Sequence, residues 1–282
     1  MMQGKTVVAT GATSGIGEVA VLELARMGAR IVFVARDERR AEATMKKLET
    51  QAPGRGHRVH LADLSLMAET RRVGQAIAQQ EPRVDVLINN AGAMFADRRV
   101  TAEGLEMTFA LNHMAYFTLT AALCDKLVAS APARIVSTAS TAHRGMRLDF
   151  SDLQGMRRYN GQAYGRSKLA NILFTRELAR RLAGTAVAAN CFHPGFVATR
   201  LGDASGGWTG RLFPFAKMFA ITPERGADTL VYLASSPEVA NVTGAYFVKR
   251  KVTEPSSAAR DDSAAKRLWE ASEALAGPWP AR

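Results

Sequence analysis

Cysteine is scarce in this chain, which holds only Cys124 and Cys191 among its 282 residues. Neither belongs to a CxxC motif or has the spacing of metal ligands. Each lies in an apolar stretch, which is typical of a reduced, buried cysteine that packs as a small hydrophobic side chain. The sequence therefore predicts a disulfide-free protein of the cytoplasm with no metal centre.

Long hydrophobic runs are also missing, because no stretch of eighteen or more apolar residues occurs. The opening MMQGKTVVAT leads directly into a predicted strand, without the charged and apolar regions of a signal peptide. We therefore expect no membrane anchor and a cytoplasmic location. Internal repeats and low-complexity tracts are absent as well.

Runs of like charge are lacking, although 37 basic residues outnumber 26 acidic ones and leave a formal charge of +11. The basic residues are scattered in short pairs such as Arg39–Arg40 and Arg71–Arg72, without interleaved aromatic residues. Binders of single-stranded nucleic acid combine such basic runs with aromatic residues, so we expect no nucleic-acid partner. The net charge remains compatible with an anionic ligand such as a phosphorylated cofactor.

Short apolar runs alternate with amphipathic stretches along the whole chain. The predicted strands lie at 5–10, 29–36, 58–64, 84–92, 133–140, 187–195 and 244–249. The predicted helices lie at 16–27, 37–50, 68–80, 102–130, 164–182 and 223–234, with a C-terminal helix at 258–276. This alternation predicts one α/β domain over residues 1–282, a Rossmann-type, doubly wound, seven-stranded parallel sheet with helices on both faces.

Residues 196–221 interrupt the alternation and combine several glycines with Trp208, Phe213, Phe215 and Phe219. A segment of this length and composition beside a strand end is typical of an apolar lid over a substrate. Two short helices that pack on the body of the protein are the alternative.

Gly11, Gly15 and Gly17 follow the first predicted strand and open the first helix. Glycines there allow the backbone to approach a pyrophosphate, which the N–H groups of a helix N-terminus then bind. The position of these residues at the start of a βαβ unit makes the pattern much more specific than three glycines alone. The pattern predicts a dinucleotide site.

The end of the second strand indicates which dinucleotide is bound. NAD-binding folds usually place an acidic residue there for the ribose 2′-hydroxyl, whereas an arginine accommodates the 2′-phosphate of NADP. This strand ends Val34-Ala35-Arg36, so NADP(H) is favoured. Pairing of Arg36 with the adjacent Asp37, which would leave an ordinary surface arginine, is the alternative.

Tyr164 and Lys168 are four residues apart in a predicted helix, so their side chains lie on one face. A tyrosine ordinarily titrates near about 10, and a neighbouring cation lowers that value toward the working pH of an enzyme. The spacing alone also fits a surface pair. Next to a dinucleotide site it indicates a proton-transfer tyrosine.

These motifs together resemble those of the short-chain dehydrogenase/reductase family, in the same order along the chain. The matching segments are TGATSGIG at 10–17, LADL with Asp63, NNAG at 89–92, LNH with Asn112, ARIVSTAS with its serine and YGRSK. The stretches AYGRSKLANILFTRELARRL, HPGFVATRL and RLWEASEALAG are most similar to the branch of retinol dehydrogenases, WW-domain oxidoreductases and protochlorophyllide reductases.

The resemblance implies two sets of site residues. The implied catalytic residues are Asn112, Ser140, Tyr164 and Lys168. The implied cofactor-binding residues are Gly11, Thr13, Ser14, Gly15, Ile16, Gly17, Arg36, Asp63, Leu64, Asn90, Ala91, Gly92, Tyr164, Lys168, Pro194, Gly195, Val197 and Thr199. Relatives usually end the fifth strand with two serines, but this chain has Ala139-Ser140, so Ser140 is preferred over Ser137. His113 and His193 are expected to be buried histidines with hydrogen-bond partners.

The resemblance also implies a function. Tyr164 would transfer a proton to or from the substrate oxygen, Ser140 would donate to that oxygen, and Asn112 would hold a water that links Lys168 to solvent. The expected activity is NADP(H)-dependent hydride transfer between nicotinamide and the carbonyl or alcohol of a lipophilic small molecule, similar to a retinal, a steroid or a ketone. A homodimer or homotetramer that pairs through the long helices carrying Asn112 and Tyr164 is implied by analogy. A non-catalytic NADP(H)-sensing regulator of the same fold is the alternative.

Overall fold

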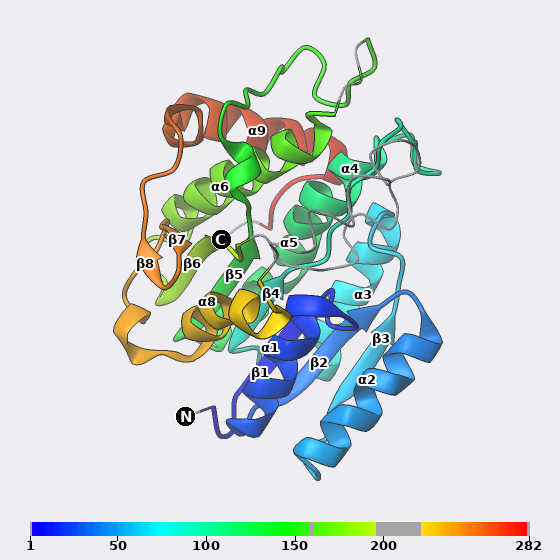
Figure 1. Cartoon of the computed structure of the whole chain (residues 1–282), viewed down its shortest axis with the longest axis vertical. Helices are drawn as coiled ribbons and strands as arrows, with labels where there is room; N and C mark the ends of the chain where they lie inside the picture. The colour runs from blue at the N-terminus through cyan, green and yellow to red at the C-terminus, as the bar shows by residue number, and fades with distance from the viewer. Residues whose placement is uncertain (1, 158, 160, 196–220, 281–282) are drawn as a thin grey trace.

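A computed structural model describes residues 2–157, 159, 161–195 and 221–280 (Figure 1). The predicted lid at 196–221 lies, except for its last residue, outside the part of the chain that the structure describes. Among the described helices, none is long and apolar enough to cross a membrane.

A single sheet with the strand order β3-β2-β1-β4-β5-β6-β7-β8 forms the centre of the molecule. Its strands are β1 Thr6–Thr10, β2 Arg30–Ala35, β3 Arg58–Leu61, β4 Val86–Asn89, β5 Ala133–Thr138, β6 Val187–His193, β7 Tyr246–Val248 and β8 Lys251–Val252. The sheet reverses its direction of winding between β1 and β4, which are parallel neighbours paired from Val7↔Val86 to Ala9↔Ile88. In doubly wound sheets this switch point is where a ligand binds.

The seven predicted strands are all present, but the prediction of a seven-stranded, wholly parallel sheet is wrong. An eighth strand, β8, pairs antiparallel with β7 through Phe247↔Val252 and Val248↔Lys251. The hairpin turn consists of Lys249 and Arg250, both with positive φ, of 50° and 62°. Two-residue hairpin turns of this kind usually contain Asn or Gly, so the Lys-Arg pair carries no turn signal in the sequence.

Helices cover both faces of the sheet, as the alternating pattern predicted (Figure 1). Their bounds are α1 Gly15–Arg26, α2 Glu38–Gln51, α3 Met67–Gln80, α4 Met107–Phe109, α5 Ala115–Ala129, α6 Ala163–Arg181, α8 Pro223–Ser235 and α9 Asp262–Ala276. Apolar residues of α1, α2 and α8 form the core on one face, and those of α3, α5 and α6 form the core on the other. Helix α9 packs outside α6.

The long helix expected at 102–130 begins five residues later, at Met107. Gly104 takes a φ of +81°, and the N–H of Thr101 bonds the carbonyl of Leu105, so the preceding residues form a turn. Glu106 then caps the helix, because its carboxylate accepts from the N–H groups of Thr108 and Phe109, each at 2.7 Å. A π-helical turn at Ala110–Met114 separates α4 from α5.

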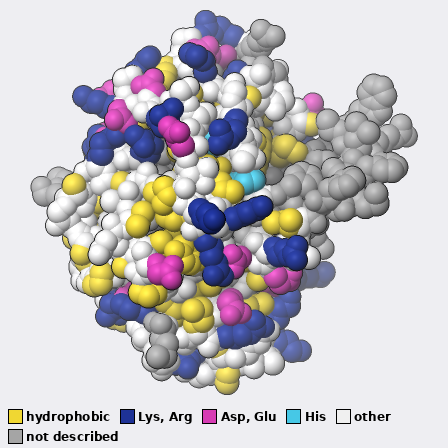
Figure 2. All heavy atoms as spheres, turned by 60° about the vertical axis from the view of Figure 1, so that its left-hand side comes forward, with side chains coloured by type: hydrophobic (Ala, Val, Ile, Leu, Met, Phe, Trp, Pro, Cys, Tyr) yellow, Lys and Arg dark blue, Asp and Glu magenta, His cyan; other side chains and the backbone are white. Residues whose placement is uncertain are grey.

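Surface charges of both signs are interspersed on the face shown in Figure 2, where Lys and Arg side chains lie among Asp and Glu. Many charged side chains of the described residues form ion pairs, such as Lys47 with Glu18 at 2.7 Å and Arg260 with Glu254 at 2.6 Å. Exposed pairs of this kind contribute about 0 to 1 kcal/mol each to stability.

Candidate active site

The glycine loop between β1 and α1 brings backbone segments too close together for side chains. A Cβ on Gly17 would lie 2.1 Å from the carbonyl oxygen of Gly11, and one on Gly11 would lie 2.8 Å from the Asn90 amide nitrogen. Gly11 and Gly15 also have positive φ, of 64° and 56°. Gly17 therefore requires glycine because of its close contact, Gly15 because of its positive φ, and Gly11 for both reasons.

The N-terminus of α1 opens toward the switch point without a side-chain cap. Ser14 is the N-cap residue, yet its hydroxyl accepts no hydrogen bond from the first turn, which includes Ile16. The positive end of the helix and its free N–H groups suit a phosphate. Thr13 and Ser14 border this opening, whereas Ile16 and Gly17 are buried. These residues fit the pyrophosphate of a dinucleotide.

Asn90 joins the carboxyl ends of three strands into one floor. Its backbone N–H donates to the Thr10 hydroxyl at 2.9 Å, and its side-chain amide donates to the carbonyl of Gly11 at 3.1 Å. The Thr138 hydroxyl donates to the Asn90 side-chain oxygen at 2.9 Å. The N–H of Ala91 also donates to Thr10, at 3.0 Å. Sequence reasoning missed Thr10 and Thr138, whose only signal is their place at the last residue of a strand.

Arg36 extends into solvent beyond the end of β2, with 75% of its side chain exposed. Its guanidinium lies 3.8 Å from the Asp63 carboxylate, while Asp37 instead caps α2 by accepting from the N–H of Arg40 at 2.9 Å. The alternative in which Arg36 pairs with Asp37 is therefore not what the structure shows. Asp63 is itself oriented by the backbone and hydroxyl of Ser65, at 2.9 and 2.8 Å, and its neighbour Leu64 is buried.

Tyr164 lies in the first turn of α6, beside Ser140 at the end of β5. Burial raises the pKa of Tyr164 to about 12, and a hydrogen bond with Ser140 acts in the opposite direction. The Lys168 ammonium lies over the Tyr164 ring, 5.5 Å from its centroid. The fold therefore assembles these three sequence-predicted residues, from two separate segments, at the carboxyl edge of the sheet.

Lys168 is buried in the free protein, with 2% of its surface exposed. Its ammonium donates to the carbonyl of Thr138 at 3.1 Å, and the Asn171 amide donates to the same carbonyl at 3.1 Å. Burial lowers the pKa of Lys168 to about 7. The lysine is thus held at a fixed point but close to losing its charge at neutral pH.

Asn112 lies on the π-helical turn and binds the loop after β4. Its amide donates to the carbonyl of Ala93 at 2.9 Å and to the hydroxyl of Ser167 at 3.0 Å, while its side-chain oxygen accepts from the N–H of Ala93 at 2.9 Å. A Cβ on Gly92 would come within 3.1 Å of that oxygen and 3.6 Å of the Lys168 nitrogen. The side chain of Asn112 therefore fixes backbone, and it meets Lys168 only across Gly92.

His143 holds the backbone of the predicted catalytic serine, a role that sequence reasoning missed. Ser140 caps the short helix Thr141–His143 by accepting from the N–H of Ala142 at 3.2 Å. The N–H of Ser256 donates to His143 Nε2 at 3.1 Å, so Nδ1 carries the proton and donates to the Ser140 carbonyl at 2.6 Å. Burial lowers the pKa of His143, which keeps the ring neutral. No local signal could reveal the contact with Ser256, which is 113 residues away and sets the tautomer of His143.

The other predicted residues are placed as follows. His113 is buried and bonds the Ser272 hydroxyl at 2.9 Å through Nε2, whereas its Nδ1 has no hydrogen-bond partner among the described residues. His193 Nδ1 accepts from the N–H of Thr141 at 3.3 Å. Pro194 and Gly195 directly follow β6, and Gly195 has a φ of +92°. Ser137 is buried within β5. Val197 and Thr199 lie outside the described residues.

The sequence profile of the short chain dehydrogenase family matches residues 5–209. This chain belongs to the short-chain dehydrogenase family. Human retinol dehydrogenase 13 is 42% identical over 281 residues, which cover 97% of this chain and 85% of that protein. Mouse retinol dehydrogenase 14 is 43% identical over 293 residues, with 98% of this chain and 87% of that protein covered. Within the family, the chain falls in the retinol dehydrogenase-like branch.

Solved structures of the family match the fold. An uncharacterized protein from Mycobacterium paratuberculosis superposes with a TM-score of 0.80 at 33% identity, over 99% of this chain and 96% of that one. A short chain dehydrogenase from Burkholderia cenocepacia in complex with NADP gives a TM-score of 0.69 at 26% identity, over 87% of this chain and 96% of that one. The chain is accordingly an oxidoreductase of a family that uses nicotinamide cofactors.

Proposed function

We propose that this short-chain dehydrogenase is an NADP(H)-dependent enzyme that transfers hydride between nicotinamide and the carbonyl or alcohol group of a lipophilic small molecule. The observation that carries the proposal is Tyr164, which is hydrogen-bonded to Ser140 and faces the Lys168 ammonium, which lies beside Gly92 in the loop after β4. A sensor without chemistry, the alternative, has no need of such a proton donor.

The cofactor, when bound, supplies the hydride, and the protein supplies position and a proton. The proposed cofactor site consists of three parts. These are the loop at Gly11–Gly17, the floor that Asn90 forms, and the exposed Arg36. The oxygen of a carbonyl substrate would lie against the hydroxyls of Ser140 and Tyr164. Ser140 then donates a hydrogen bond to the oxygen as negative charge develops on it, and Tyr164 donates its proton.

Lys168 assists Tyr164 by charge. An ammonium next to a phenol favours the phenolate, which opposes the effect of burial on Tyr164. The hydrogen bond from Lys168 to the carbonyl of Thr138 holds the lysine nitrogen on the side of α6 that carries Tyr164. In the oxidation direction the same phenolate accepts the proton of an alcohol.

The substrate class rests on relatives and on sequence. Proteins named retinol dehydrogenase match nearly the whole chain. The apolar residues of the lid predicted at 196–221 are the sequence basis for a lipophilic substrate, and all of that segment except Ile221 lies outside the described part of the chain. Retinals, steroids and hydrophobic ketones therefore form the panel to test.

The first test replaces Tyr164 with Phe. We expect NADPH oxidation with the best carbonyl of the panel to fall by about 10²- to 10⁴-fold, the usual contribution of general acid catalysis. NADPH binding, followed by the fluorescence of the bound nicotinamide, should persist, and Tyr232→Phe on α8 serves as the matched control. Turnover within tenfold of the wild-type rate would refute the role of Tyr164. If the wild type binds NADPH but turns over no carbonyl of the panel, that result would favour the sensor.

The second test addresses the cofactor through Arg36→Asp. The guanidinium extends into solvent, 75% exposed and 3.8 Å from the Asp63 carboxylate, and its planar group suits bidentate binding of a 2′-phosphate. We expect the KM for NADPH to rise at least tenfold more than the KM for NADH. Arg40→Asp, four residues on, is the control for a general change in charge. Equal effects of Arg36→Asp on both cofactors would refute the NADP(H) preference.

A further inference from the structure

The Lys168 ammonium lies between two tyrosine rings rather than over one. Its nitrogen is 5.5 Å from the ring centroid of Tyr164 on its own helix and 5.8 Å from that of Tyr116 on α5. Tyr116 is the second residue of α5, directly after the π-helical turn, and only 1% of its surface is exposed. The motifs that identify the family site do not include this second tyrosine.

The described surroundings of the ammonium contain no carboxylate that pairs with it, and burial alone lowers the pKa of Lys168. From β5 it meets the carbonyl of Thr138, and from α6 it meets Tyr164 and Asn171, whose amide shares that carbonyl. From α5 it meets Tyr116. The titratable groups that face it are thus the two tyrosines, both neutral in the free protein because burial raises the pKa of each.

A neutral aromatic ring attracts a cation through the negative face of its π-system, and the attraction strengthens where water is excluded. One carbonyl oxygen and two ring faces are then the main attractions that offset the cost of burying this charge. Tyr164 is also assigned to the substrate through its hydroxyl, whereas Tyr116 is 1% exposed and has no such role.

We propose that Tyr116 is a positioning residue of the catalytic centre, whose ring face holds the Lys168 ammonium charged and fixed against Tyr164. The inference deepens the proposed function and rests on it, because a charged Lys168 matters to catalysis only if Tyr164 transfers the proton. The ring carries the effect, and the hydroxyl of Tyr116 does not.

The experiment measures the titration of Lys168 directly, in the full chain without substrate. Lysine labelled with ¹³C at Cε gives one NMR signal for each of the nine lysines in the sequence, and the signal that disappears in Lys168→Met belongs to Lys168. Tyr116→Leu and Tyr116→Met should lower the pKa of Lys168 by about one unit, a tenfold loss in the stability of the charged form. Tyr116→Phe, which keeps the ring, should shift that pKa by less than about a third as much.

A matched control is Tyr232→Leu, which removes the contact of the Arg250 guanidinium over the Tyr232 ring at 5.5 Å, remote from the sheet edge. It should leave the Lys168 signal unchanged. Tyr116→Met retains much of the buried volume, so a folded non-aromatic variant is available if Tyr116→Leu unfolds. An unchanged Lys168 titration in the Leu or Met variant would overturn the proposal, and so would a fall in Tyr116→Phe as large as in Tyr116→Met. The NMR titration of Lys168 requires no turnover. A failure of this proposal can therefore be distinguished from a failure of the proposed function, which Tyr164→Phe tests.

Discussion

At the scale of the residue, the site consists of titratable groups whose ordinary ionisation is opposed by burial. Burial raises the pKa of Tyr164 to about 12 and lowers that of Lys168 to about 7, so both groups favour the neutral form in the free protein. Hydrogen bonds from Ser140 and contacts with two aromatic rings act against that tendency. Such opposition is typical of functional sites rather than of structural ion pairs.

The buried lysine makes stability depend on pH in a defined window. The folded pKa of Lys168 is about 7 against 10.5 for the ordinary side chain, so between these values the unfolded chain binds more protons and stability rises with pH. Tyr164, with a folded pKa of about 12 against 10.0, lowers stability only above about pH 10. The window for Lys168 alone is therefore about pH 7 to 9.5.

We expect the free energy of unfolding of the wild type, minus that of Lys168→Met, to rise across this window by at most about 3 kcal/mol, at about 1.36 kcal/mol per unit. Urea unfolding at several pH values measures the difference. Lys266→Met, at an exposed position of α9, should give a difference that does not depend on pH. Parallel curves for the wild type and Lys168→Met would show that the lysine is not held in this way.

Residues whose role depends on local spacing could be predicted, and residues whose role depends on distant partners could not. Tyr164 and Lys168 are one helical turn apart, so the sequence alone places them on one face. The tautomer with which His143 bonds Ser140 is set by Ser256, and Tyr116 acts through Lys168; both partners are far away along the chain. Only the folded chain shows these contacts.

At the scale of the element, the β1–α1 turn both packs tightly within the fold and borders the proposed cofactor site. Gly17 lies inside α1, where Ala would normally be favoured by about 1 kcal/mol. A Cβ there would nevertheless lie 2.1 Å from the carbonyl oxygen of Gly11, which belongs to a loop bound to Asn90. The clash outweighs the gain in helix propensity, because overpacking costs about 1 to 3 kcal/mol or more.

Gly17→Ala should therefore lower the free energy of unfolding by about 1 to 3 kcal/mol and raise the Kd for NADPH at least tenfold. Chemical denaturation and a fluorescence titration with NADPH measure the two effects. Gly161→Ala is the control, since no atom of the described residues lies within 4 Å of a Cβ there. A Gly17→Ala variant with wild-type stability and affinity would contradict the tight packing of this turn.

Other elements show where sequence patterns lose information. The expected helix at 102–130 contains a π-helical turn, and β8 is formed by two exposed residues. Apolar periodicity cannot distinguish α from π over one turn, and a two-residue edge strand is too short to alternate. The other seven strands were predicted because their apolar runs are long enough to form a recognisable pattern, including β3, whose residues are only partly buried.

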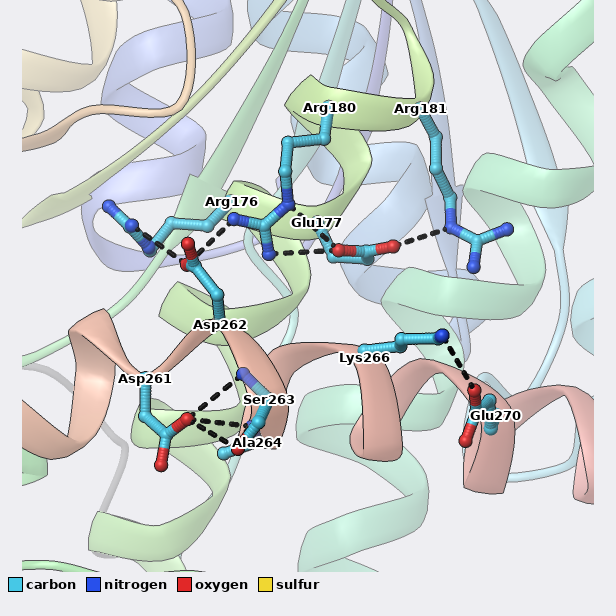
Figure 3. A network of polar contacts seen from close by, with 10 residues as sticks. All are labelled: Arg176, Glu177, Arg180, Arg181, Asp261, Asp262, Ser263, Ala264, Lys266 and Glu270. Atoms are coloured by element: carbon cyan, nitrogen blue, oxygen red, sulfur yellow. Dashed lines mark hydrogen bonds and ion pairs between the residues drawn. The ribbon is translucent and has the colours of Figure 1, made fainter.

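At the scale of the whole molecule, α9 lies across the outer side of the helices that carry the catalytic residues. Figure 3 shows Asp262 at its start between Arg176 and Arg180 of α6, at 3.0 and 2.7 Å. Farther along, Trp269 packs on Phe174 of α6 and on Phe117 of α5, with ring centroids 5.9 and 5.1 Å apart. The C-terminal helix thereby joins α5 and α6 from outside.

Trp269→Ala should lower the free energy of unfolding by about 3 to 5 kcal/mol, because the side chain is 1% exposed and its removal leaves a cavity between three helices. Lys266→Ala on the same helix is the exposed control. The measurement is denaturant unfolding followed by circular dichroism. A loss below about 1 kcal/mol would mean that α9 contributes little to the packing of α5 and α6.

The same helix bears on self-association, which stays a proposal. Pairing of two copies through α5 and α6, as the family resemblance implied, would have to displace Trp269 and the Asp262 ion pairs. We expect any homodimer or homotetramer of the full chain to form through another surface. Light scattering on the wild type and on a surface variant of α9 such as Lys266→Glu measures the mass. A dimer that Lys266→Glu dissociates would place the interface on α9 itself.

The sequence by itself determined the alternation of strands and helices, the glycine loop, Arg36 at the second strand and the Tyr164–Lys168 pair, because each depends on short-range spacing or on apolar periodicity. Only the structure showed that Asp37 caps a helix instead of pairing with Arg36, that an eighth strand extends the sheet at its edge, and that Tyr116 faces Lys168. The Asp37 cap and the β7–β8 pairing are short-range contacts that the sequence pattern did not resolve, whereas the contact of Tyr116 with Lys168 depends on the distance between segments far apart in the chain, which only packing sets. The burial that shifts the pKa of Tyr164 and Lys168 is of the same kind, because it exists only once the helices have closed over the sheet.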